Sequence, residues 1–415
     1  IHIDGHSDMA PPKYFPGFPF FKFPSKGKDR FLMQENDMFI MSAVITGLIG
    51  KVVWIWPSWD EVNHQNFSFG NKMEIGLTTN SFDIQMKTFC LCTTNETCQT
   101  MCFGVLNEFI DDEFVDFVEI YPKSCEIKRT ITFEEIREEE GVEKMAASLT
   151  YIGTQGTILD IDEDYYGCMH AIRPLLDAGL TEERVSDIDE ILSELFCPKD
   201  AAEEFFTDQL LVGFLDEILK LRCTKGKTDA TGHDCLNEMF ILSFTKQVKK
   251  KLFQHYSNLL CFGVTKIHTK NMLMRHLIEK FLGLNNAQNK ALQYVGFCLT
   301  STPLTFNLSN EGGFLICHGR NTPNESIVIE HQTNIKEITQ RTNSLRNILA
   351  VIKKANPKVV TLCRSMRDGY TPRKYFSKIE NDVIDSLRHT FENTKVVYDS
   401  GLLGGKKGWP ERNKR

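Results

Sequence analysis

Two short acidic motifs in this chain combine residue types that bind metal ions and activate water. Each follows an apolar run, IHI at the start of the chain and TIL in its centre, and places its polar residues at alternate positions. The motifs are Asp4, His6 and Asp8, and Asp160, Asp162 and Asp164. Carboxylates with an imidazole are typical ligands of hard divalent cations such as manganese or magnesium, whereas structural zinc sites prefer cysteine and histidine.

The number of carboxylates favours two metal ions over one. Four of these carboxylates, those of Asp4, Asp8, Asp160 and Asp162, would repel one another if held close together, unless cations neutralise them or some stay protonated. Two ions about 3.5–4 Å apart that share a water lower the pKa of that water and give a hydroxide nucleophile near neutral pH. A single Asp-x-Asp motif is more often a turn or a helix N-cap, but two such motifs after apolar strands favour a metal site.

The first motif can form a metal site only if the chain curls. On an extended strand, Asp4 and Asp8 would lie about 13 Å apart. We therefore expect the backbone to turn after Asp4, and the small residues Gly5 and Ser7 allow such a turn.

The surrounding sequence predicts strands and helices that position the motifs. Apolar, strand-like runs occupy residues 1–4, 51–57, 82–92, 114–122 and 156–162, and a helix is predicted over 36–49. The segment 10–29, rich in proline and aromatic residues, is expected to be an ordered loop that folds over the first motif. Ligand sites of parallel sheets gather at the carboxyl ends of strands, which is where both motifs stand.

The second half of the chain changes to helical periodicity before strand-like runs return. Helices are predicted over 187–196, 201–222, 235–260, 270–284, 333–354 and 375–394, and strands over 313–319, 357–364 and 395–399. We expect residues 1–170 and 300–400 to form one α/β domain with a mostly parallel sheet. Residues 171–299 would form a large helical insertion, and the basic residues 401–415 a flexible tail.

Composition and charge argue against several classes of function. A formal net charge of −7 does not favour a general nucleic-acid or membrane-surface binder, and no apolar run reaches the roughly 18 residues of a membrane span. Thirteen scattered cysteines, an odd number, indicate reduced thiols and a cytoplasmic protein. Tripeptides of the N-glycosylation pattern leave a secreted protein open; they begin at Asn66, Asn95, Asn307 and Asn324. The spacing of Cys90, Cys92, Cys98 and Cys102 fits no familiar zinc site.

Four blocks of sequence resemble the arginase, or ureohydrolase, superfamily. They are HIDGHSDM, QEND with the following VVWIWPSW, LDIDEDYY, and TLCRSMRDGYTP, and they cover the front quarter, the centre and the C-terminal sixth of the chain. The nearer likeness is to a poorly characterised branch that includes bacterial peptide arginases, which convert arginine residues of ribosomal peptides to ornithine. The resemblance implies a three-layer α/β/α fold and two manganese ions, whereas the helical region matches no feature of the family.

The resemblance also implies roles for the residues of the two motifs. Asp4 and Asp160 would bridge both ions, and Asp162 would be a terminal ligand. His6 would complete one metal site and Asp8 the other. Histone-deacetylase relatives typically keep one zinc ion and lack the full set of carboxylates, so the presence of both Asp8 and Asp162 favours the branch with two metals.

Three further residues stand beside this ligand set. Asp164 occupies the position expected for an acid that orients a ligand or the substrate. His2 shares a strand face with Asp4, but we do not expect it to bind metal because it belongs to the strand itself. The family supplies another metal-binding histidine from a Glu-Asp-His-like segment upstream of the first motif, and we expect that residue to precede this chain.

Residues that recognise the substrate are harder to identify from sequence. A guanidinium group needs a planar carboxylate partner, for which Asp368 is our candidate, with Arg364 beside it. The pair Asp368-Gly369 is equally able to form a simple turn. Glu35 and Asn36 are candidates to line the pocket, although Asn36 is equally suited to cap the helix that follows.

The sequence thus leads to one expected reaction and two alternatives. We expect hydrolysis of a guanidinium C–N bond, with arginine in a peptide or protein converted to ornithine and urea, and His331 as the candidate that passes a proton to the departing amine. An amide deacylase on the same scaffold would instead release a carboxylic acid. A non-catalytic interaction protein would keep the metal ligands without turnover.

Overall fold

The computed structural model describes most of the chain as two compact units. The described residues are 1–12, 18–26, 32, 37–61, 72–79, 87–94, 100–110, 113–149, 156–225, 243, 245–248, 250, 257–261, 267–299, 313–318, 329–366 and 369–398. The first unit comprises Ile1–Gly167, Thr333–Arg364 and Lys378–Thr394, and the second Cys168–Gln332, Ser365–Ser377 and Lys395–Arg415. The second unit therefore contains the whole range predicted to be a helical insertion. The predicted tail, 401–415, lies outside the described residues.

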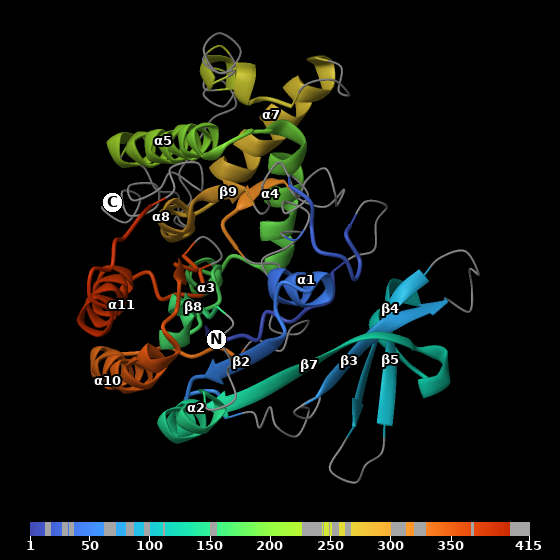
Figure 1. Ribbon diagram of the computed structural model, residues 1–415. Coiled ribbons are helices and arrows are strands. Elements are labelled where there is room, and N and C mark those ends of the chain that lie inside the picture. The colour runs from blue at the N-terminus through green and yellow to red at the C-terminus, as the bar shows by residue number, and fades with distance from the viewer. Residues whose placement is uncertain are drawn as a thin grey trace. The chain divides into compact units, whose positions relative to one another are not determined.

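A mixed nine-stranded sheet forms the centre of the first unit (Figure 1). Its order is β11-β8-β1-β2-β7-β3-β4-β5-β6. The strands are β1 (His2–Ile3), β2 (Lys51–Trp56), β3 (Met73–Thr79), β4 (Lys87–Thr94), β5 (Thr100–Ile110), β6 (Glu113–Ile120), β7 (Glu126–Arg137), β8 (Ile158–Asp162) and β11 (Val359–Cys363). Strands β11, β8, β1, β2 and β7 are mutually parallel, which confirms the expected α/β class and mostly parallel sheet. From β7 onward, β3 to β6 continue the sheet as antiparallel neighbours.

Helices of the first unit follow from amphipathic sequence and local capping. They are α1 (Phe39–Thr46), α2 (Gly141–Leu149), α10 (Ile335–Ile352) and α11 (Phe376–Thr390), with 3-10 turns η3 (Pro122–Ser124), η4 (Glu138–Glu140), η5 (Glu163–Tyr166) and η7 (Lys353–Ala355). Asn334 caps α10 by accepting the backbone N–H groups of Lys336 and Glu337. Gly141 lets α10 approach α2, because a Cβ there would lie 2.9 Å from Ile348. Helices over 36–49, 333–354 and 375–394 were predicted from sequence, and the described parts of these ranges contain α1, α10 and α11.

Two disulfides tie the antiparallel part of the sheet together. Cys92 on β4 and Cys102 on β5 occupy directly opposed positions of the antiparallel pair and are bonded. Cys90 on β4 is bonded to Cys125, which precedes β7, so this link passes over the intervening strand β3. It does so at Gly76, where the register of β3 against β7 shifts. Reduced thiols are therefore a wrong prediction for these cysteines, because strand pairing brings together residues that look scattered in sequence.

Replacing Gly76 by alanine is expected to destabilise this part of the sheet by about 1–3 kcal/mol, the usual cost of overpacking. The new Cβ would overlap the carbonyl oxygen of Glu126 and lie 2.9 Å from Sγ of Cys125. Thermal denaturation should show the loss, and peptide mapping without reduction should show incomplete formation of the Cys90–Cys125 bond. Gly104→Ala on β5 is the matched control, because its Cβ would meet its nearest neighbour, Ile120, at an ordinary 3.4 Å. Equal stability of the two variants would contradict the argument.

The second unit is mainly helical around one apolar core. Its elements are α3 (Arg173–Asp177), α4 (Glu182–Leu195), α5 (Ala201–Lys225), η6 (Ser257–Leu259), α7 (Ile267–Leu282), α8 (Asn286–Val295), β9 (Phe297–Leu299) and β10 (Phe314–Ile316). The helices predicted over 187–196, 201–222 and 270–284 and the strand predicted over 313–319 are confirmed. Most of the helix predicted over 235–260 lies outside the described residues. The prediction of a strand over 395–399 is wrong for the described residues 395–398, since they pair with no described strand and Val397 is exposed.

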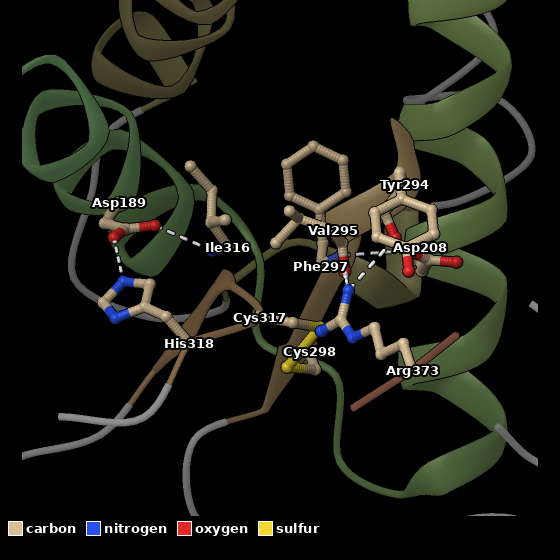
Figure 2. The surroundings of a disulfide bond; sticks show 10 residues. All are labelled: Asp189, Asp208, Tyr294, Val295, Phe297, Cys298, Ile316, Cys317, His318 and Arg373. Atoms are coloured by element: carbon tan, nitrogen blue, oxygen red, sulfur yellow. Dashed lines mark hydrogen bonds and ion pairs between the residues drawn. A yellow bond between two sulfur atoms is a disulfide. The ribbon is translucent and has the colours of Figure 1, made fainter. Parts of the chain in front are cut away.

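Two carboxylates hold the β9–β10 hairpin of the second unit. Asp189 on α4 accepts the backbone N–H of Ile316 at 2.7 Å and pairs with His318 at 2.6 Å. Asp208 on α5 accepts the N–H of Phe297 at 2.9 Å. Figure 2 shows these side chains around the disulfide that joins Cys298 of β9 to Cys317 after β10. A fourth disulfide, Cys197–Cys261, joins the residues that follow α4 and η6.

Among the described residues, no helix is both long enough and apolar enough to span a membrane.

Candidate metal centre

The two acidic motifs meet because their strands are neighbours. Strand β1 lies between β2 and β8, and its register pairs His2 with Asp160 and Ile3 with Ile161. After β1 the chain turns as expected: the backbone N–H of His6 donates to Oδ1 of Asp4 at 2.7 Å. Gly5 allows a close approach at this turn, because a Cβ would lie a tight 3.1 Å from Oδ1 of Asp164. The turn thus brings the first motif onto the residues that follow β8.

Five side chains form two groups of possible metal ligands that share Asp4. The His2 group consists of His2, Asp4 and Asp8, and the His6 group of Asp4, His6 and Asp164. In each group the ligand atoms all lie within 4.8 Å of one another. Nε2 of His2 lies 3.0 Å from Oδ2 of Asp4 and 3.9 Å from Oδ2 of Asp8. Nδ1 of His6 lies 2.8 Å from Oδ2 of Asp164 and 3.6 Å from Oδ1 of Asp4.

Burial and mutual charge shift the pKa values of this cluster strongly. Burial alone would lower the pKa of His2, but the charge of Asp4 and hydrogen bonds with Asp160 and Asp4 outweigh it and raise this pKa well above 6.5. Burial acts to raise the pKa of Asp4, yet the charge of His2 and its hydrogen bond hold this pKa far below 3.8. Burial, with the charge of Asp4, raises the pKa of Asp8 well above 3.8 and that of Asp164 to about 7. Metal ions would therefore displace protons from this cluster as they bind.

The donor set fits hard divalent cations. Carboxylate oxygens with one imidazole per group suit manganese or magnesium better than a structural zinc site. In an octahedral site with bonds of about 2.1 Å, adjacent ligand atoms lie about 3 Å apart and opposite ones about 4 Å. The separations between histidine nitrogens and carboxylate oxygens in the two groups, 2.8–3.9 Å, fall within that range. Asp4 is 1% exposed and offers one oxygen to each group.

The structure places only some of the expected metal ligands in the two groups. Asp4, His6 and Asp8 lie in the two groups, and so does Asp164, which was expected to orient a ligand or the substrate. Asp160 and Asp162 lie in neither group of the described residues. Asp160 contacts Nδ1 of His2 at 2.9 Å and accepts the hydroxyl of Thr361 on β11. Asp162 accepts the backbone N–H of Asp164 at 3.2 Å and so caps η5.

Sequence reasoning passed over His2 because a residue inside a strand is usually part of the core. The side chain is 2% exposed, but both ring nitrogens face carboxylates. The available signal was the alternation of His2 with Asp4, His6 and Asp8, which places His2 and Asp4 on the same strand face.

The structure describes only two of the residues predicted to bind the substrate or to transfer a proton, Arg364 and His331. Arg364, at the end of β11, donates to Oε1 of Glu380 on α11 from Nε at 2.9 Å and from Nη2 at 2.7 Å. His331 belongs to the second unit, where its backbone N–H donates to the carbonyl of Cys168. Their proposed roles stay predictions. Glu35, Asn36 and Asp368 lie outside the described residues, as do residues 13–17 and 27–29 of the loop expected over 10–29.

Buried hydrogen bonds hold the backbone of the centre in place. Nε1 of Trp54 on β2 donates to the carbonyl oxygen of Asp4 at 3.1 Å. Nε1 of Trp59 donates to the carbonyl oxygen of Tyr165 at 3.0 Å, and Arg341 on α10 to that of Tyr166 at 3.0 Å. The segment η5, which carries Asp164, is thus fixed from two sides.

No protein-family model and none of the curated proteins matches this chain. The likeness to the arginase superfamily therefore depends on the four sequence blocks quoted above and stays a prediction.

Proposed function

We propose that this protein is a metal-dependent hydrolase that cleaves a C–N bond of a guanidinium group with the help of two manganese ions. The observation that carries the proposal is that Asp4 belongs to both ligand groups. A carboxylate that offers one oxygen to each of two groups is suited to bridge two ions, and centres of this kind serve hydrolysis. The arginase-like three-layer arrangement is part of the same proposal.

The chain's own residues would divide the work at this centre. Bound ions would supply a hydroxide nucleophile near neutral pH and polarise the substrate. Without metal, burial and the charge of Asp4 raise the pKa of Asp164 to about 7, so an ion that binds this carboxylate and His6 would displace its proton. The side chains of Asp8 and His6 are 16% and 20% exposed, so they form the rim that faces solvent.

The substrate class comes from the likeness to peptide arginases. We propose arginine within a peptide or protein as the substrate, and ornithine and urea as the products. The roles of Asp368 toward the guanidinium group and of His331 toward the leaving amine stay predictions from the sequence. The four disulfides favour maturation in an oxidising compartment over the cytoplasm that the odd number of cysteines indicated.

The full chain reconstituted with manganese is expected to bind about two ions and to release urea from an arginine-containing peptide. Mass spectrometry would measure the metal content and detect the ornithine product, and the same protein after chelation would be the control. Release of a carboxylic acid from an N-acyl substrate, without urea, would identify an amide deacylase instead. Two bound ions with no turnover would favour a non-catalytic interaction protein, and no bound manganese would overturn the proposal.

A further inference from the structure

We propose that His2 binds one of the two metal ions through Nε2, and that Asp160 is the positioning residue that orients this imidazole. The inference builds on the proposed metal-dependent function but changes its ligand set. The resemblance assigns Asp160 to bridge both ions and gives His2 no role. The geometry instead points to His2 as a metal ligand and to Asp160 as the residue that orients it.

The imidazole of His2 connects Asp160 with the shared carboxylate Asp4. Nδ1 of His2 lies 2.9 Å from Oδ2 of Asp160, on the neighbouring strand β8. Nε2, on the other side of the ring, lies 3.0 Å from Oδ2 of Asp4 and 3.9 Å from Oδ2 of Asp8. Because Nε2 and these two carboxylates converge, a cation placed among them would have three ligand atoms of one group.

The surroundings of Asp160 are those of an orienting residue. One oxygen is engaged by Nδ1 of His2, and the other accepts the hydroxyl of Thr361. Thr361 is the register partner of Asp160 across the β11–β8 pair, so the strand ladder itself fixes this contact. Metal-binding histidines usually donate their second ring N–H to a carboxylate, which fixes the tautomer and the orientation of the ring. The chain from Thr361 through Asp160 to His2 matches that arrangement.

The division of roles makes the two ligand groups chemically equivalent. Each then offers one imidazole, the shared Asp4 and one further carboxylate, Asp8 in the His2 group and Asp164 in the His6 group. Without His2, the first group would keep only two carboxylates. Its side chain is 2% exposed, so a ligand at this position would also be shielded from competing water.

A double-mutant cycle on the full chain tests this inference, with manganese content and affinity as readouts. His2→Gln is expected to reduce the bound manganese from about two ions to about one per chain. Asp160→Asn alone should lower the affinity for one of the two ions by about 10–100-fold, the usual effect of losing an outer partner of a metal ligand. In the His2→Gln background, Asp160→Asn should have no further effect, because Asp160 acts only through the imidazole.

Control variants separate this test from folding and from the proposed function. His276→Gln, at an exposed position of α7, should leave manganese binding unchanged. Thr361→Val removes only the hydroxyl that contacts Asp160, and it should lower the affinity for the same ion as Asp160→Asn does. This variant provides the test if His2→Gln fails to fold. Unchanged binding in His2→Gln, or a full additional loss from Asp160→Asn in its background, would overturn the inference. A wild-type chain that binds no manganese would instead overturn the proposed function on which it rests.

Discussion

An Asp4→Asn variant is expected to lose both metal ions together, and any hydrolase activity with them. Asp4 belongs to both ligand groups, with one oxygen near His2 and the other near His6. The loss of an outer partner alone typically costs 10–100-fold in metal affinity, so removing a shared ligand should cost more than about 100-fold for each ion. Calorimetric titration with Mn²⁺ would measure this loss.

The same variant should keep its fold when no metal is present. Asparagine has the size of aspartate, and its carbonyl oxygen still accepts the backbone N–H of His6. The variant also loses its ion pair with His2, so its metal-free form should melt at a lower temperature than the wild type, while circular dichroism below the transition should show the same fold. Asp385→Asn on α11 serves as the control, since its side chain is 67% exposed and lies outside both ligand groups. Loss of one ion with retention of the other would show that Asp4 is not shared.

Replacing Arg341 by methionine is expected to destabilise the first unit by about 3–5 kcal/mol, the range found when a buried ion pair loses one partner. Arg341 and Glu138 are each 6% exposed, and Nε of Arg341 lies 3.6 Å from Oε2 of Glu138. The variant would leave the Glu138 carboxylate buried without its countercharge. It would also remove the hydrogen bond to the carbonyl of Tyr166, which holds η5 beside the metal centre. Denaturation by urea would measure the loss.

Two further variants separate the ion pair from simple loss of packing. Glu138→Gln combined with Arg341→Met removes both charges and should recover part of the stability lost in the single variant. Lys144→Met breaks the exposed pair of Lys144 with Glu140 and should cost less than about 1 kcal/mol. If Arg341→Met cost no more than Lys144→Met, the buried pair would not support η5 as argued.

The parallel core of the sheet could be predicted from sequence because its strands are continuous apolar runs. The segment VVWIW is buried along β2, and β8 carries its acidic motif at the end of such a run. Strand β7 was missed because EIKRTITFEEIR mixes charged and apolar residues, and much of this strand is exposed. Its place in the sheet comes from pairing with β2 and β3, which no local pattern of sequence reveals.

Long-range pairing also explains what the sequence left out at the metal centre. The motif residues Asp4, His6 and Asp8 were identified because their types and spacing are local properties. The role of His2 depends on its register with Asp160, a residue 158 positions away. The same holds for the cysteines, whose bonded partners are separated by 35, 10, 64 and 19 residues.

The Cys197–Cys261 disulfide would hold the molecule together even if the backbone between these two cysteines were cut. A protease that cut the chain anywhere within this 64-residue interval would leave two polypeptides joined by the disulfide and visible as separate fragments only after reduction. In the loop-entropy model, the bond also raises the free energy of the unfolded chain by about 4 kcal/mol. Backbone hydrogen bonds from Cys197 to Leu259 and from Cys261 to Leu195 flank the link, so the junction would stay paired after such a cut.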